Sequence, residues 1–152
     1  MKISRSGRGW LYALVAALFA SGLLWWILDR WFPVAGEFGA EKHPAEPWLL
    51  RLHGLAAMLF LVLVGTLLPR HVRGGWRARL NRRSGAVHLA WNGLLAVTGY
   101  ALYYAGSERL RGAASSLHLG LGLLLPLVLG VHVVRGRFVR RLRAGGGDPP
   151  KR

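Results

Sequence analysis

The sequence contains no cysteine among its 152 residues. This absence excludes disulfide bonds, thiolate metal sites, ligation of an iron–sulfur cluster, covalent attachment of a c-type haem and a cysteine nucleophile within this chain. Acidic residues are also scarce, with six Asp and Glu against 21 Lys and Arg and a formal net charge of +15. Because no constellation typical of a soluble catalytic site is present, we assign any substrate chemistry to a partner protein rather than to this chain.

Long uncharged hydrophobic stretches are abundant. Apolar residues make up 53% of the chain and include seven tryptophans, which is more than a soluble domain of this size can bury. A helix needs about 20 apolar residues to cross a bilayer. Stretches of that kind occupy residues 10–28, 48–68, 86–104 and 115–134. The sequence therefore predicts an all-α membrane protein, a four-transmembrane-helix up-and-down bundle over residues 1–140, with a basic, disordered cytoplasmic tail over 141–152.

The first stretch allows an alternative interpretation as a signal peptide. Residues 17–20, Ala-Leu-Phe-Ala, resemble a small-residue cleavage site. The apolar run continues through residues 25–28 without a polar break. This continuation favours a retained first span.

Positive charge alternates with the hydrophobic stretches. Residues 1–9, the loop 70–86 and the tail from residue 135 hold three, six and seven Lys and Arg, with Asp148 as their single acid. The remaining segments hold five Lys and Arg and five acids. This asymmetry follows the positive-inside rule with both termini in the cytoplasm, and it predicts a multi-pass protein of the bacterial inner membrane. Basic loops then contact anionic lipid headgroups, and nucleic-acid binding gives no reason for such alternation.

Two histidines lie in the last hydrophobic stretch. His118 and His132 are 14 residues apart, which in a helix returns to within ~40° of one direction and separates them by ~21 Å. In the predicted orientation, His53 lies level with His118 near the outer surface, and His88 lies level with His132 near the inner surface. Ionisable side chains inside a membrane are costly and usually face the bundle interior. We therefore expect two level pairs, His53/His118 and His88/His132.

Neutral imidazole is a good axial ligand of haem iron, and a histidine pair makes a six-coordinate centre that passes electrons. We interpret the four histidines as axial ligands of one or two b haems held between facing helices. His71 rivals His88, because it follows His53 by 18 residues, nearly a whole number of helical turns. Arg51 and Asn92 are expected to support a haem propionate or a ring nitrogen. Glycines near the ligands would let a porphyrin approach the backbone, namely Gly54, Gly120, Gly122 and Gly130.

Three parts of the sequence carry a resemblance to a known family. They are Arg51-Leu-His53-Gly54 at the start of the second stretch, His118 and His132 in the fourth, and Thr98-Gly-Tyr-Ala-Leu-Tyr-Tyr104 at the end of the third. Over roughly residues 48–140 the chain resembles the small four-helix cytochrome b proteins of bacterial membranes, of the kind that serve as membrane subunits of hydrogenases and formate dehydrogenases. Unlike several of these cytochromes, the chain has no histidine in its first span.

The resemblance implies non-covalent haem b, bis-histidine ligation at His53 and His118, and electron exchange between a quinone pool and a redox partner such as a c-type cytochrome or a dehydrogenase. The sequence thus favours an electron-transfer protein of the inner membrane. Two alternatives stay open. One is a cofactor-free membrane scaffold or assembly protein whose histidines only bridge helices. The other is a small metal-handling transporter that uses His43 and the acids around it.

Overall fold

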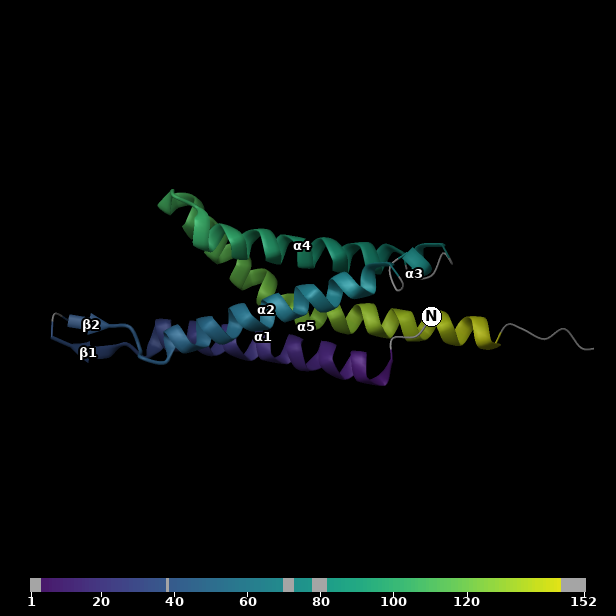
Figure 1. The fold of residues 1–152 in the computed structure, drawn as a ribbon, viewed down its shortest axis with the longest axis horizontal. Coiled ribbons are helices and arrows are strands. Elements are labelled where there is room, and N and C mark those ends of the chain that lie inside the picture. Colours follow the sequence, from purple (N-terminus) through teal and green to yellow (C-terminus); the bar gives the residue numbers. More distant parts are fainter. Residues whose placement is uncertain (1–3, 38, 70–72, 78–81, 146–152) are drawn as a thin grey trace, which may run out of the picture. The chain divides into compact units, whose positions relative to one another are not determined.

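Four long helices make up most of the chain in the computed structural model, which describes residues 4–37, 39–69, 73–77 and 82–145 (Figure 1). The elements in chain order are α1 (Arg5–Trp31), β1 (Val34–Gly36), β2 (Gly39–Glu41), α2 (Glu46–Leu67), α3 (Arg73–Arg77), α4 (Arg82–Tyr104) and α5 (Glu108–Gly145). The expected all-α class is confirmed for the long elements. His71, the rival ligand, lies outside the described residues.

The helix boundaries follow local sequence signals. Ser4 caps α1, because its Oγ accepts the backbone N–H of Gly7 at 3.0 Å. The helix α2 begins at Glu46 with Pro47 in its first turn, where the missing proline N–H costs no hydrogen bond. Both helices therefore start a few residues before the apolar stretches that predicted them.

A small antiparallel hairpin occupies part of the polar segment that was expected to be a loop. Its strands β1 and β2 pair Val34 with Glu41 and Gly36 with Gly39. Gly39 has a φ of 121°, a conformation that side chains with a Cβ rarely adopt. This glycine therefore permits the tight reversal, a detail that hydrophobic periodicity does not reveal.

The last helix is much longer than the predicted span. We expected a turn at residues 106–114 and a helix over 115–134, but α5 runs for 38 residues from Glu108 to Gly145. Residues 108–112 and 135–143 are rich in Arg, Leu and Glu, which favour helix, and contain no proline. The predicted tail 141–152 thus begins inside α5, and its residues 146–152 lie outside the described part of the chain.

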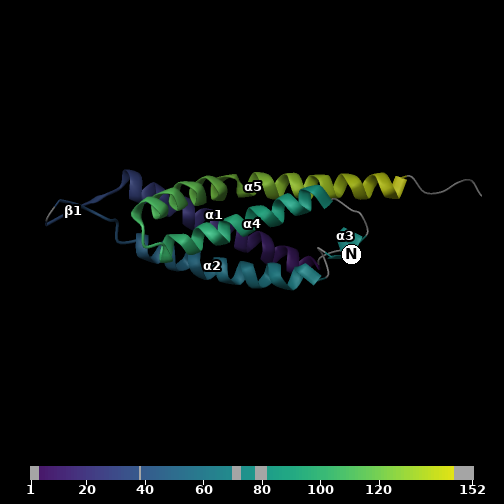
Figure 2. The same ribbon diagram turned by 90° about the horizontal axis from the view of Figure 1, so that it is seen from above.

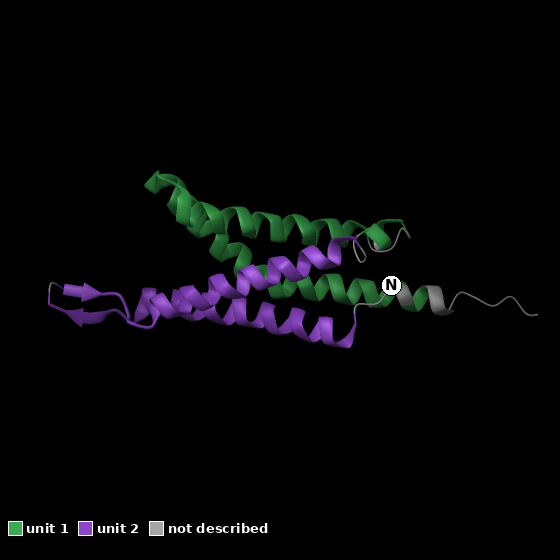
Figure 3. Ribbon diagram, viewed as in Figure 1, with its two compact units in different colours: residues 1, 70–152 green, residues 2–69 purple. Residues whose placement is uncertain are grey.

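The chain divides into two compact units, each built on one helical hairpin (Figure 3). Unit 2, residues 2–69, holds α1 packed on α2, and unit 1, residues 70–152, holds α4 packed on α5. The two helices of each unit contact each other, and Figure 2 shows the α4–α5 hairpin from above. Between the helices of unit 2 lie Val15, Ala56 and Phe60, and the buried apolar residues of unit 1 are Ala114, Leu121 and Leu125.

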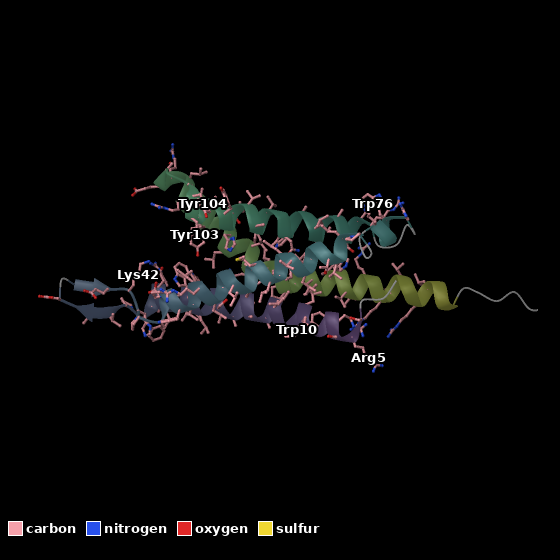
Figure 4. The ribbon with its side chains drawn as sticks, viewed as in Figure 1. Arg5, Trp10, Lys42, Trp76, Tyr103 and Tyr104 are labelled. Carbon is pink, nitrogen blue, oxygen red and sulfur yellow. The ribbon has the colours of Figure 1, made fainter. Side chains whose placement is uncertain are left out.

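Most large apolar side chains of the described residues are exposed rather than buried. Three helices are long and apolar enough to cross a membrane, namely α1, α2 and the part of α5 from Glu108 to Val139. The helix α4 is long enough at 23 residues but less apolar, because it contains His88, Asn92 and Thr98 in addition to its tyrosines. Tyr103 and Tyr104 project from its end (Figure 4). The predicted span over residues 86–104, which lies in α4, therefore stays a prediction.

Candidate functional site

The hairpin of unit 2 brings His53 of α2 against Ser21 of α1. The Ser21 Oγ lies 3.0 Å from His53 Nδ1, and Ser21 is only 2% exposed. The hydroxyl also donates its hydrogen to the carbonyl oxygen of Ala17 at 2.6 Å. A hydroxyl has a single hydrogen, so toward the imidazole its oxygen acts as acceptor. This arrangement favours the tautomer of His53 that carries its proton on Nδ1.

The hairpin of unit 1 repeats this arrangement at His118. Thr98 of α4 places its Oγ1 2.9 Å from His118 Nδ1 and donates its hydrogen to the carbonyl oxygen of Leu94 at 2.8 Å. Thr98 is 6% exposed. The same reasoning favours the Nδ1–H tautomer of His118.

A third hydroxyl faces the other histidine of α5. Ser84 Oγ lies 3.2 Å from His132 Nδ1. Ser84 and Thr98 are 14 residues apart on α4, as are His118 and His132 on α5. Because the two helices form an antiparallel hairpin, equal spacings bring both hydroxyls level with both imidazoles. The 14-residue spacing thus has a counterpart on α4 that the sequence analysis missed.

A glycine follows each of these hydroxyl residues in the sequence and leaves room for the imidazole. A Cβ built on Gly22 would lie 3.1 Å from His53 Cε1, one on Gly99 3.3 Å from His118 Cε1, and one on Gly85 3.9 Å from His132 Cε1. We call Ser21–Gly22, Ser84–Gly85 and Thr98–Gly99 the hydroxyl–glycine pairs. They let the helices approach closely enough for the hydrogen bonds to form.

The glycines expected to leave room for a porphyrin are not those of the hydroxyl–glycine pairs. A Cβ on any of the four glycines expected beside the ligands would meet nothing within 4 Å. Those expected glycines, open in the structure, are Gly54, Gly120, Gly122 and Gly130. The glycines that touch imidazoles belong to the facing helix, because residues beside a histidine on its own helix point around the helix axis rather than toward its ring.

His88 and His132 come together within unit 1. Their ring centroids are 5.4 Å apart and the planes differ by 12°, so α4 and α5 do juxtapose the two histidines of the predicted inner pair. The Nδ1 of His88 is buried and has no hydrogen-bond partner among the described residues. Asn92 donates from Nδ2 to the His88 carbonyl oxygen at 2.7 Å and thus bonds along its own helix rather than to an imidazole.

The predicted outer pair is divided between the two units, since His53 belongs to unit 2 and His118 to unit 1. The pairing of His53 with His118 therefore stays a prediction. Arg51 is exposed, and its Cζ lies 4.7 Å from the ring centroid of Trp48. This contact leaves the guanidinium accessible to a carboxylate while its stem covers apolar surface.

His43 takes part in a local network before α2. The Nδ1 of His43 accepts the backbone N–H of Ala45 at 3.1 Å. The backbone N–H of His43 donates to Glu46 Oε1 at 3.0 Å. The Lys42 Nζ lies 3.9 Å from Glu46 Oε2 and 3.7 Å from Asp29 Oδ1. Lys42 is next to the β1–β2 hairpin (Figure 4). Within the described residues, no group of three or more His, Cys, Asp or Glu is placed to hold a metal ion.

Comparisons with protein families, with curated proteins and with solved structures found no match for this chain. The chemistry must therefore be argued from the residues alone. In an imidazole that donates its Nδ1–H to a hydroxyl, the lone pair lies on Nε2. A histidine that binds a metal uses such a lone pair. Imidazole is also the side chain that supplies axial ligands to haem iron.

Proposed function

We propose that this chain is a b-type cytochrome of the bacterial inner membrane that relays electrons between a quinone and a redox partner protein. Bound haem b would supply reversible one-electron oxidation and reduction of its iron. The protein supplies the imidazole ligands, an apolar surrounding and guanidinium groups for the propionates. The observation that carries the proposal is the contact of a buried hydroxyl with Nδ1 of His53 and with Nδ1 of His118, at 3.0 and 2.9 Å.

The proposed ligand assignment follows the hydroxyl–glycine pairs. His53 and His118 would hold an outer haem, and His132 with His88 an inner one, with His71 as the rival of His88. A second-shell acceptor at Nδ1 fixes the direction of the imidazole and raises its basicity. Within this proposal Arg51 would pair with a propionate carboxylate, for which its planar fork is well suited. Asn92 would act indirectly, by its bond to the His88 carbonyl.

Haem content measured on the purified protein tests the proposal. Expressed with ample porphyrin precursor, the protein should show reduced α and Soret bands after dithionite, and the pyridine haemochrome assay should count one or two haems per chain. His118→Ala should remove the outer haem and His132→Ala only the inner one. His43→Ala is the matched control, because His43 hydrogen-bonds locally with Ala45 and Glu46, and it should keep the wild-type haem content.

A cofactor-free membrane scaffold is the second candidate, favoured by the fact that all three hydroxyl–imidazole bonds join neighbouring helices. Such bonds stabilise membrane helix pairs by themselves. The same preparation separates the two candidates. A folded protein without any pigment would leave the scaffold and refute the cytochrome, whereas histidine variants that all keep full haem content would refute the ligand assignment.

A further inference from the structure

The cytoplasmic end of α5, in the predicted orientation, continues as a basic helix beyond what a bilayer needs. At a rise of ~1.5 Å per residue the 38 residues of α5 span ~57 Å, against ~30 Å for a hydrocarbon core. The uncharged apolar run of α5 ends at Val134, but the helix continues to Gly145. Residues 135–145 contain five arginines and no acid. We name this part of α5, Arg135–Gly145, the arginine extension.

An exposed apolar stripe runs from the span into the arginine extension. It consists of Leu127, Val131, Val134, Phe138 and Leu142, with exposed fractions of 64%, 49%, 64%, 61% and 61%. At ~100° per residue these five positions fall within ~80° of one another around the helix. The face that would meet acyl chains inside the span therefore continues without interruption past the end of the span.

Exposed arginines border this stripe on both sides. On the same helical projection, Arg135 and Arg141 lie about 60° to either side of the stripe centre, and Arg137 lies further round on the Arg141 side. All three are exposed. Apolar residues flanked by guanidiniums are the pattern of a helix that rests in the interface of a membrane, with the stems over acyl chains and the charges among phosphates.

We propose that the arginine extension binds anionic phospholipid headgroups, with Phe138 and Leu142 inserted at the boundary of the acyl chains. Charge and continuity both select this occupant. A second copy of the chain would bring arginines from both flanks against each other, which costs free energy. An anionic lipid surface attracts them instead. The proposal requires only that α5 spans the membrane and does not depend on haem binding.

Hydrogen exchange of the full-length protein in nanodiscs tests the surface. Amides of residues 138–145 are followed by mass spectrometry in discs of neutral phosphatidylcholine and in discs that contain half phosphatidylglycerol. Exchange should be slower in the anionic discs, because a docked helix opens less often. In the double variant Arg135→Gln/Arg141→Gln, the slowing of exchange in anionic discs relative to neutral discs should shrink by about fivefold for each arginine removed.

The matched control is Arg109→Gln/Arg111→Gln, which removes two exposed arginines from the opposite end of the same helix. It should leave exchange of residues 138–145 unchanged in both kinds of disc. Equal exchange in neutral and anionic discs, or an equal effect of the two double variants, would overturn the proposal. Slowing in neutral discs by added inorganic phosphate alone, or only when two chains share a disc, would also overturn it.

Discussion

At the residue scale, the hydroxyls of Ser21 and Thr98 decide which nitrogen of an imidazole is left for chemistry. Each hydroxyl donates its hydrogen to a backbone carbonyl oxygen of its own helix. A hydroxyl that donates in this way accepts from the histidine Nδ1, because it has a single hydrogen. The contact therefore favours one tautomer of the imidazole, with or without a cofactor.

Removing either hydroxyl should allow the facing histidine to populate both of its neutral tautomers. In ¹⁵N-histidine NMR spectra of the haem-free protein, Ser21→Ala should turn the single Nδ1–H form of His53 into a mixture, and Thr98→Ala should do the same for His118. In the haem-loaded protein the midpoint potential should rise, because an imidazole without its acceptor is a less basic ligand and stabilises ferric iron less.

Two variants serve as controls for this prediction, Ser116→Ala and Thr66→Ala. Their hydroxyls donate to carbonyl oxygens of their own helices and are exposed, so neither tautomers nor potentials should change. An unchanged histidine spectrum in Ser21→Ala and Thr98→Ala would contradict the tautomer assignment. If the histidine spectrum changes but the midpoint potential does not, the result counts only against His53 and His118 as haem ligands.

The glycines provide a steric prediction at the same scale. Gly99→Ala would bring its Cβ 3.3 Å from His118 Cε1, whereas Gly93→Ala on the same helix meets nothing within 4 Å. The first should cost about 1 kcal/mol net, because overpacking outweighs the gain in helix propensity. The second should stabilise by about 0.5–1 kcal/mol. Unfolding of both variants in detergent measures the contrast, and equal behaviour would show that the helices at Gly99 adjust freely.

At the element scale, the α4–α5 hairpin is held by polar contacts as much as by apolar packing. Beyond the two hydroxyl–imidazole bonds, Trp91 Nε1 donates to the Leu121 carbonyl oxygen at 3.0 Å. Buried apolar side chains in unit 1 are few among the described residues. In a bilayer the exterior is as apolar as the interior, so such polar links and close packing carry helix association.

Trp91→Phe should therefore weaken the hairpin by about 0.6–1.7 kcal/mol, the range for one interhelical hydrogen bond in a membrane. The measurement is reversible unfolding in mixed micelles. Trp48→Phe is the control, because Trp48 is 67% exposed, and it should change stability little. Equal losses in both variants would mean that the loss in Trp91→Phe does not come from its hydrogen bond between α4 and α5.

At the scale of the whole molecule, the topology depends on α4. If α4 crosses the membrane, both termini lie in the cytoplasm and Ser107, between α4 and α5, lies outside. The absence of cysteine makes a single introduced thiol a unique reporter. Ser107→Cys in intact cells should react with a membrane-impermeant maleimide, whereas Ser4→Cys should react only after permeabilisation. Labelling of Ser4→Cys alone in intact cells would show the opposite orientation. Failure of Ser107→Cys to label would exclude a crossing by α4.

The sequence by itself determined the long helices and the positions of the histidines along them. Uncharged runs of about 20 residues form helices wherever they lie, because every backbone group must be paired within the segment in lipid. The juxtaposition of His88 with His132 also followed from sequence spacing, since helical period and hairpin connection leave little freedom. The hairpin at Gly39 and the full length of α5 did not follow, because they depend on local backbone geometry in polar segments.

Only the tertiary structure decided which residues face the imidazoles. The dipeptide of a hydroxyl residue and a glycine also occurs at Ser6–Gly7, where the Gly7 N–H is bound by the helix cap Ser4, so the pattern alone does not mark a site. What distinguishes Ser21, Ser84 and Thr98 is the register between two packed helices, which brings each hydroxyl within 3.2 Å of an Nδ1. Register is set by side-chain packing across the hairpin, and a linear pattern contains no record of it.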